Sequence, residues 1–269
     1  TVSLSALDLD SDSPPVDITR SAQDLRAFAL VLSDIADSLA REFAGRPFRE
    51  VYPSKSVKGF TRVGVNLVTN GDFQSGADSP DAWQKIDRLC SFWDTDEAHG
   101  RFMRFNTDVN LDQWRQWQSS LASGAPLASA PVALPTVPPK YDTVAGTYGV
   151  AFYSDSIPVT PGATYSIEFD AKGLPPSGIC FPKVFVKGYG PKGATQEFYN
   201  MYKSVRLDEK DRWMHFSRIF HPTDKTPDVV TMRVMLFPYW PPGEYAFDNV
   251  EIYEVVPSGS APPETPAAP

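Results

Sequence analysis

Two short stretches, far apart in the chain, constrain the fold most. The first, residues 65–73 (VNLVTNGDF), has apolar residues on both sides of an Asn-Gly-Asp turn. Val, Thr and Phe favour a half-buried strand, and Asn and Gly tolerate the positive φ of a sharp turn. The second, residues 245–253 (YAFDNVEIY), alternates apolar and polar positions, which is typical of a strand with one buried face. We therefore predict that an opening strand and a closing strand bracket one β-rich unit.

The region between these stretches contains further strand candidates separated by turn residues. The chain of 269 residues has 26 Pro and 17 Gly, and such frequent punctuation suits short strands joined by loops. In two of the candidates the pattern alternates, so that Lys187 and Tyr189 share one strand face and Arg233 and Phe237 share another. The candidates are residues 100–107, 148–153, 163–171, 182–189, 213–220 and 229–237. This pattern predicts a mainly β fold, a β-sandwich, over residues 62–256.

Residues 17–44 carry the strongest helical pattern in the chain. Apolar residues recur there with a helical period, and Leu25, Leu32 and Leu39 lie on one stripe. We expect an amphipathic N-terminal helix, followed by a connector to residue 61, whose stripe docks on the sandwich, on a protein partner or on a second copy of itself. Residues 1–16 are polar and acidic, and we interpret them as a flexible tail.

A long insertion, residues 107–145, separates two of the strand candidates. Within it, residues 110–123 have helical character and residues 125–139 are rich in Pro and Ala. Long connections of this kind are usually functional or disordered. Towards the other end of the chain, residues 257–269 contain mostly Pro, Ala, Ser and Thr, a composition typical of extended linkers. This composition predicts that the domain is part of something larger.

Composition and charge argue against several functions. The net charge of −8 disfavours nucleic acid and an anionic membrane surface as partners, and no stretch is apolar enough for membrane insertion. The three histidines lie outside any nucleophile or metalloprotease motif, so we predict that the chain is not an enzyme. A glycosidase, which needs only two carboxylates at a suitable separation, is the remaining catalytic alternative. Cys90 and Cys180 either form a disulfide or stay as buried thiols.

Three motifs, in this order along the chain, resemble one group of proteins. They are Asn-Leu-x-x-Asn-Gly-Asp-Phe at residues 66–73, Val-x-Pro-Gly-x-x-Tyr at residues 159–165 and Phe-Asp-Asn-Val-x-Ile at residues 247–252. They resemble carbohydrate-binding-module jelly rolls of the galactose-binding-like superfamily, in particular the family 4, 9 and 22 modules. The resemblance covers residues 65–255 and implies a jelly-roll β-sandwich. The N-terminal helix and the helical insertion depart from the family pattern.

The resemblance also implies a structural calcium ion. In the family this ion ties the first strand region to the last, through the Asp of the closing motif and groups around the Gly-Asp-Phe turn. The matching residues are Asp248, Asp72 and Gln74, and Gln74 stands where the family usually has Glu. Calcium prefers several carboxylate and carbonyl oxygens, so the neutral Gln is expected to weaken the site. The alternative is that Asp248 accepts hydrogen bonds from backbone amides at a strand turn.

The ligand that the resemblance implies is a carbohydrate. Trp and Tyr rings stack on the CH faces of sugars, while Arg and other polar groups bind the hydroxyls. The candidate binding residues, which we expect to be exposed, are Trp114, Trp117, Tyr189, Arg233, Tyr239 and Trp240. For Trp114 and Trp117 the alternative is that they anchor the insertion to the sandwich, and for Trp240 that it plugs a proline-rich loop.

These observations predict a non-catalytic module that binds polysaccharide or oligosaccharide. We expect it to belong to a larger exported protein that is secreted, periplasmic or at the cell surface. The alternative is a structural or protein-interaction domain of a secreted or cell-surface assembly, with the helix or the insertion as its contact surface. An open aromatic groove favours the first function, and an exposed apolar patch favours the second.

Overall fold

The structure is a computed structural model of the chain. It describes residues 2–6, 16–20, 57, 59–97, 99–134, 142–147, 149–174, 182–191, 197–204, 207 and 211–258. The chain divides into two compact units, Thr1–Glu50 and Val51–Pro269, and each is described by itself.

The N-terminal unit contains an antiparallel pair of strands. β1 (Val2–Ala6) pairs with β2 (Val16–Arg20), with Leu4 opposite Ile18. Both strands alternate apolar and small or polar residues, a pattern that suits a pleated strand better than a tail. The prediction of a flexible tail over residues 1–16 is therefore wrong for β1, and the predicted helix cannot begin at Asp17, which lies in β2. The rest of the predicted helix lies outside the described residues.

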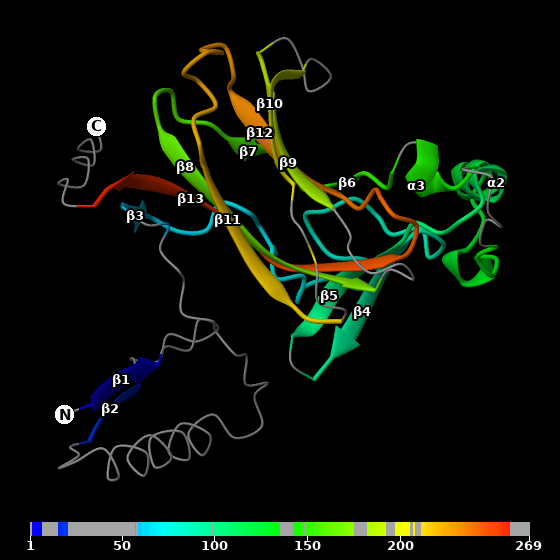
Figure 1. Ribbon diagram of the computed structural model, residues 1–269, viewed down its shortest axis with the longest axis horizontal. Helices are drawn as coiled ribbons and strands as arrows, with labels where there is room; N and C mark the ends of the chain where they lie inside the picture. The colour runs from blue at the N-terminus through cyan, green and yellow to red at the C-terminus, as the bar shows by residue number, and fades with distance from the viewer. Residues whose placement is uncertain are drawn as a thin grey trace. The chain divides into compact units, whose positions relative to one another are not determined.

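The C-terminal unit is a β-sandwich of two antiparallel sheets, as the sequence predicted (Figure 1). The first, named here the β8–β13 sheet, has β8 and β13 as its central pair. In the described part of the chain its order is β11 (Met214–Phe220), β8 (Thr164–Leu174), β13 (Glu244–Pro257), β5 (Gly100–Asn106) and β4 (Ser91–Asp96), and β3 (Phe60–Val63) also pairs with β13.

The second sheet, named here the β9–β12 sheet, faces the first across the core. Its described strands are β10 (Glu197–Ser204), β9 (Lys183–Tyr189), β12 (Thr231–Phe237) and β6 (Phe152–Tyr153), and β7 (Ile157–Pro158) also pairs with β12. From β8 onward the chain crosses between the sheets at the β8–β9, β10–β11, β11–β12 and β12–β13 connections. Strands distant in sequence therefore become neighbours, as in a jelly roll.

Alternation along the strands places the core between the sheets. In β12, Met232, Val234 and Leu236 are fully buried and point into the core. From the opposite sheet, Ile167 and Phe169 of β8 are also 0% exposed and belong to the same core cluster. The side chains between these positions must point to the outer face of each sheet. Trp83 is buried in the same cluster.

Residues 65–73 do not form the predicted opening strand but a series of turns. Asn66 Oδ1 accepts a hydrogen bond from the backbone N of Ile252 at 3.0 Å, and the backbone N of Val250 donates to Gly71 O at 2.8 Å. The two backbones approach so closely that a Cβ on Gly71 would lie 1.9 Å from Val250 O. The Asn and Gly residues thus make turns that hold this segment against β13, so the opening and closing motifs do meet.

The helical insertion is present as predicted. α2 (Leu111–Ala122) begins at Asn110, whose side chain accepts hydrogen bonds from the first free backbone amides of the helix. The insertion continues through the short helices η1 (Leu127–Ser129) and α3 (Val144–Thr147). Among the described residues, no helix is long and apolar enough to span a membrane. Cys90 is a buried free thiol, and Cys180 lies outside the described residues.

Candidate functional site

The outer face of the β9–β12 sheet gathers aromatic and cationic side chains. Pairing of the two strands sets Phe237 opposite Lys183, Met235 opposite Phe185 and Arg233 opposite Lys187. Because the neighbours Val184, Val186, Val234 and Leu236 fill the core, these side chains all point outward. β6 adds Tyr153, which pairs with Met235 from the other side. The result, named here the aromatic face, is a surface three strands wide.

Three rings on this face contact one another in a row. The Phe237 and Tyr239 rings lie nearly parallel, with centroids 5.6 Å apart and planes 14° apart. Phe185 meets Phe237 edge-to-face at 5.5 Å. All three side chains are half-buried, so part of each ring stays accessible. Such an arrangement offers flat apolar surface at a fixed orientation, which is what a planar ligand face needs.

The loop that carries Tyr239 and Trp240 is held firmly at both ends. On one side, Gly149 lies under the Phe237 ring so closely that a Cβ would be 2.6 Å from Phe237 Cζ. Beside it, the backbone N of Val150 donates to Pro238 O at 3.1 Å. At the other end, the backbone N of Thr107 donates to Gly243 O at 2.9 Å. Fixed rings lose little conformational entropy when a ligand binds.

Each cation on the aromatic face lies beside a ring. Lys183 Nζ is 5.8 Å from the Tyr239 centroid, Lys187 Nζ is 5.7 Å from that of Phe185, and Arg233 Cζ is 5.0 Å from that of Tyr153. Arg233 Nε also donates to Ser154 O at 2.6 Å, which fixes the guanidinium. These groups supply positive charge and hydrogen-bond donors at the border of the rings.

The structure brings some of the predicted binding residues together and separates others. Arg233 and Tyr239 lie on the aromatic face, and Trp240 is a half-buried residue of the same loop. Tyr189 is on the same strand as Lys187, but its side chain is only 7% exposed. The expectation that Tyr189 is an exposed contact is therefore wrong, although its strand and its face were predicted correctly.

The tryptophans of the insertion are anchors in the structure. Trp117 is 6% exposed and donates from Nε1 to Asp87 O at 2.6 Å. It packs with Leu89, Cys90 and Val109 in a second apolar cluster, against which Trp114 also packs. The prediction of an exposed Trp117 is thus wrong, and the alternative, that these rings fasten α2 to the sandwich, is what the contacts show.

Sequence reasoning missed several residues of the aromatic face as site residues: Tyr153, Lys183, Phe185, Lys187 and Phe237. The alternating patterns of β9 and β12 did place some of them on the same strand face as Arg233 or Tyr189. The sequence did not indicate that β9 pairs with β12 and not with another strand. Only this pairing brings the outward residues of the two strands together into one surface.

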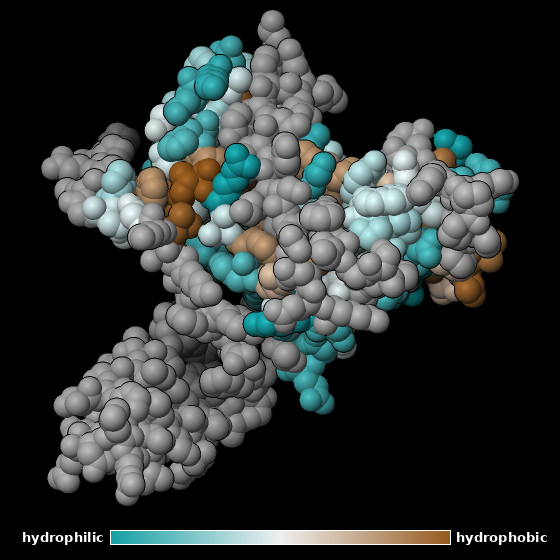
Figure 2. All heavy atoms as spheres, viewed as in Figure 1, coloured by the Kyte–Doolittle hydropathy of each residue, from teal (hydrophilic) through white to brown (hydrophobic). Residues whose placement is uncertain are grey.

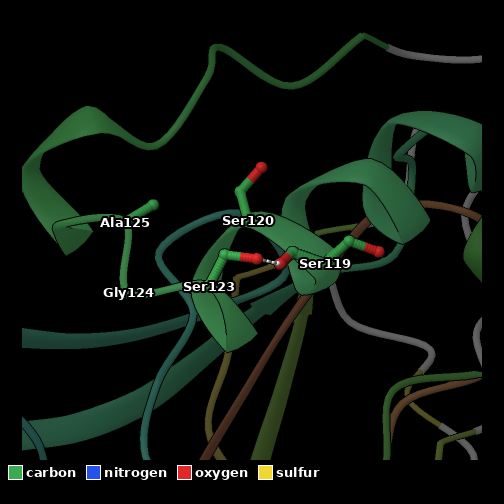
Figure 3. Close-up of a pocket in the computed structure, with 5 residues that line it drawn as sticks. All are labelled: Ser119, Ser120, Ser123, Gly124 and Ala125. Atoms are coloured by element: carbon green, nitrogen blue, oxygen red, sulfur yellow. Dashed lines mark hydrogen bonds between the residues drawn. The ribbon is translucent and has the colours of Figure 1, made fainter.

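Two hollows on the surface are poorer candidates. One of about 470 Å³ lies at the C-terminal end of α2 and is lined by Ser119, Ser120, Ser123, Gly124 and Ala125 (Figure 3). Each serine hydroxyl there donates to the carbonyl four residues earlier, at 3.0 Å, so it is engaged by its own helix.

The second hollow, of about 420 Å³, runs along β4 between the sandwich and η1. Its rings are partly covered, because Arg101 lies 3.9 Å from the Trp93 centroid and Arg104 lies 4.0 Å from that of Phe92. Neither hollow offers the open, stacked rings of the aromatic face.

A buried ionic cluster occupies the outer face of the β8–β13 sheet. His215 Nδ1 is 2.8 Å from Asp170 Oδ1, and its Nε2 is 3.3 Å from Glu168 Oε2. Arg62 bridges Glu168 at 2.7 Å and Glu251 at 3.1 Å. The carboxylates of Asp170 and Glu168 hold the imidazolium and raise the pKa of His215 to about 9, against the opposing effect of burial. Burial raises the pKa of Glu168, but hydrogen bonds from His215 and Arg62 outweigh it, so that the pKa is lowered overall.

The side chain of Gln74, one of the three residues predicted to bind calcium, is not oriented as a ligand of that ion. Gln74 directs its nitrogen, not its oxygen, at backbone carbonyls, and an N–H donor cannot ligate a cation. Asp248 is fully buried, and its Oδ1 accepts a hydrogen bond from the backbone N of Asn249 at 2.7 Å. In the described part of the chain, no group of three or more His, Cys, Asp or Glu side chains is placed to hold a metal.

No protein-family model matches the chain, and no curated protein matches it. Solved structures with a similar fold include "Family 16 Carbohydrate Binding Module-2", at 14% identity and a TM-score of 0.41 over 70% of this chain and 100% of that one. Another is the CBM22-1 xylan-binding domain from Paenibacillus barcinonensis Xyn10C, at 11% identity and a TM-score of 0.40 over 74% and 99% of the two chains.

A third is the TmCBM61 structure in complex with β-1,4-galactotriose, at 12% identity and a TM-score of 0.38 over 71% of this chain and 99% of that one. The similar solved structures thus include a family 22 module and a structure titled "CBM4 structure and function". Families 4 and 22 are two of those that the sequence motifs resemble. All of these TM-scores lie below 0.5, so the function has to be inferred from the residues of this chain.

Proposed function

We propose that the sandwich is a non-catalytic carbohydrate-binding module whose ligand lies across the aromatic face. The observation that carries this proposal is the fixed row of contacting rings, Phe185, Phe237 and Tyr239, on the outer face of one sheet. The CH faces of a sugar ring pack on such aromatic rings, and the ligand's hydroxyls accept hydrogen bonds from nearby Lys and Arg side chains. The aromatic face supplies both kinds of contact within one surface.

The proposal of a non-catalytic module is supported by the burial of two carboxylates that lie close together in the sandwich. Glu168 and Asp170 are neighbours on β8, but they are 0% and 3% exposed. Both are hydrogen-bonded to His215. A glycosidase needs one carboxylic acid and one carboxylate that reach the sugar from opposite sides of the bond. Buried groups that are held by internal partners support a structural role.

The module works, in this proposal, within a larger exported protein. The composition of residues 257–269, mostly Pro, Ala, Ser and Thr, supports a linker to a further domain. A binding module tethered in this way raises the local concentration of its partner domain on a polymer. The polymer is then the natural ligand, and a single sugar would bind weakly.

The decisive experiment measures binding of the intact chain to a panel of soluble polysaccharides and compares two matched variants. Tyr239→Ala removes an accessible ring from the aromatic face, and we expect it to weaken binding by about 1–3 kcal/mol with little change in melting temperature. Phe92→Ala is the control, because Phe92 is a half-buried ring that lies 4.0 Å from Arg104 on the opposite sheet. It should leave binding unchanged.

A third variant, Trp117→Ala, separates ligand contact from anchoring. Loss of this buried ring should lower the free energy of unfolding by about 3–5 kcal/mol, while the fraction that remains folded binds as the parent does. The proposal fails if no polysaccharide binds the parent, or if Phe92→Ala weakens binding as much as Tyr239→Ala does. In that case the interaction-domain alternative gains, with the insertion as its contact surface. Val132 and Leu134 there are 86% and 59% exposed, and Figure 2 shows a small hydrophobic patch at the end of the molecule that carries α2.

A further inference from the structure

The side chain of Gln74 joins two parts of the sandwich that are distant in sequence. Its Nε2 donates to Asp72 O at 2.7 Å in its own turn, and to His99 O at 3.1 Å and Arg101 O at 2.9 Å in the β4–β5 hairpin. The Nε2 group has two hydrogens, so three carbonyl acceptors use its full capacity to donate hydrogen bonds. One side chain therefore ties the turn at residues 70–74 to the start of β5.

The orientation of this amide is fixed by a fourth hydrogen bond. Gln74 Oε1 accepts from the backbone N of Arg101 at 3.2 Å, while Nε2 donates to the carbonyl of the same residue. This reciprocal pair of hydrogen bonds resembles one rung of a β-ladder. The pairing of β5 with β13 runs from Asn106 to Met103, and Gln74 adds one further pair of hydrogen bonds to β5 at Arg101, on the N-terminal side of Met103. If the amide were reversed, Nε2 would face the N–H of Arg101, and Oε1 would face three carbonyl oxygens. Both contacts would be repulsive, so the nitrogen must point at the carbonyls.

Three backbone carbonyls that converge on one point form an environment suited to a cation. Carbonyl and carboxylate oxygens are the ligands that calcium takes in proteins. Here the partial positive charge of an amide N–H₂ group satisfies those oxygens instead. A carboxylate at the same position would repel them unless a cation lay between.

We propose that the Gln74 carboxamide takes the place of a metal ion in this sandwich. It fastens the 70–74 turn to the β4–β5 hairpin without calcium, and the single change Gln74→Glu converts the carbonyl cradle of Asp72, His99 and Arg101 into a calcium site. The sandwich then folds without calcium because residue 74 is a neutral Gln. A Glu at this position would need calcium to offset its repulsion from the three carbonyls.

The test compares thermal unfolding of the intact chain in excess chelator and in millimolar calcium. The parent should melt at the same temperature in both. Gln74→Ala should melt about 2–6 °C lower in both, because it loses the hydrogen bonds and gains no ligand for the ion. Gln74→Glu should melt below the parent in chelator, regain that loss in calcium, and show saturable calcium binding by calorimetry.

A charge-matched control is Gln113→Glu in α2, where the amide donates to a single carbonyl, that of Val132, at 2.7 Å. Its melting temperature should not respond to calcium. A parent that is stabilised by calcium would overturn the proposal, because the ion would then bind with Gln74 in place. So would a Gln74→Ala variant that melts with the parent, or a Gln74→Glu variant that calcium does not rescue.

Discussion

The outer faces of the two sheets use the same kinds of side chain in opposite ways. On the β8–β13 sheet, cations lie over rings, as Arg62 does over Tyr253 at 4.0 Å, but the same cations also pair with carboxylates. Arg62 bridges Glu168 and Glu251, and Arg104 bridges Asp94 and Glu244. On the β9–β12 sheet, the outward positions of β9 and β12 contain rings and cations and no carboxylate of their own.

This difference indicates that the β8–β13 face contributes to stability and the β9–β12 face to ligand binding. Where Arg62 and Arg104 pair with carboxylates, the polar groups satisfy one another and contribute to folding. Where half-buried rings gather on one face, as Phe185, Phe237 and Tyr239 do, their remaining surface can meet a ligand. The two faces therefore predict different responses to substitution: loss of stability on one side, loss of binding on the other.

Among substitutions on the two outer faces, the largest effect should come from breaking the ionic cluster. Glu168→Ala removes a fully buried carboxylate that accepts from both Arg62 and His215, and it leaves two positive groups without their shared partner. We expect the free energy of unfolding to fall by about 3 kcal/mol, measured by chemical denaturation, with ligand affinity unchanged.

Glu251→Gln provides the comparison within the same cluster. Glu251 also pairs with Arg62, but its side chain is 33% exposed, so water screens the interaction. The expected loss is below about 1 kcal/mol. If Glu168→Ala and Glu251→Gln both lowered the free energy of unfolding by less than about 1 kcal/mol, the cluster would contribute little to stability. The difference between the two faces would then consist only of ligand binding at the aromatic face.

The pH dependence of stability should reveal the same cluster. The folded pKa of His215, about 9, lies above its ordinary value of 6.5, so its contribution is complete below pH 6.5 and is lost as pH rises through 9. The folded pKa of Glu168 lies below its ordinary value of 4.5, so its contribution is present above pH 4.5 and is lost as pH falls through the folded pKa.

Chemical denaturation of the parent at a series of pH values should show that the free energy of unfolding falls at alkaline pH, and His215→Gln should abolish this fall. An alkaline loss of the same size in His215→Gln would contradict the assignment.

The fold could be predicted largely from local patterns, because alternation reports burial on a strand. The predicted strand segments are found as β5, β8, β9, β11, β12 and β13, and the expected alternation of burial is clearest in β9. The failures were segments where polar residues decide the backbone. At residues 65–73 the Asn66 side chain accepts hydrogen bonds from the backbone N of Val68 and from that of the distant residue Ile252, and this converts an apparent strand into turns. Such long-range hydrogen bonds leave no trace in a local pattern.

The candidate site was predictable only in part, for a related reason. Tyr239 and Arg233 could be named because Tyr and Arg are residue types that bind sugars. Their neighbours Phe185 and Tyr153 could not, since only the pairing of β12 with β9 and β6 brings them together. Exposure was equally hidden, because nothing near Trp117 in sequence indicates that Asp87, 30 residues away, accepts its hydrogen bond.

The smallest expected effect concerns the charge of the ligand. Lys183, Lys187 and Arg233 place three cationic side chains on the aromatic face of a chain whose net charge is −8, so we expect a polysaccharide that contains uronic acid to bind more tightly than its neutral counterpart. The difference should shrink as salt is added, because ions screen charges on an open surface.

Arg233→Gln tests the source of this preference. The variant removes the charge but keeps an N–H donor that can reach Ser154 O, so the face should stay folded. Affinity for the acidic polymer should fall by about 0.5–1 kcal/mol at low salt, and affinity for the neutral one should stay the same. Arg115→Gln, on the exposed side of α2, is the control and should change neither. If the parent binds both polymers equally at every salt concentration, stacking on the rings alone governs recognition, and the cations serve to hold the rings in place.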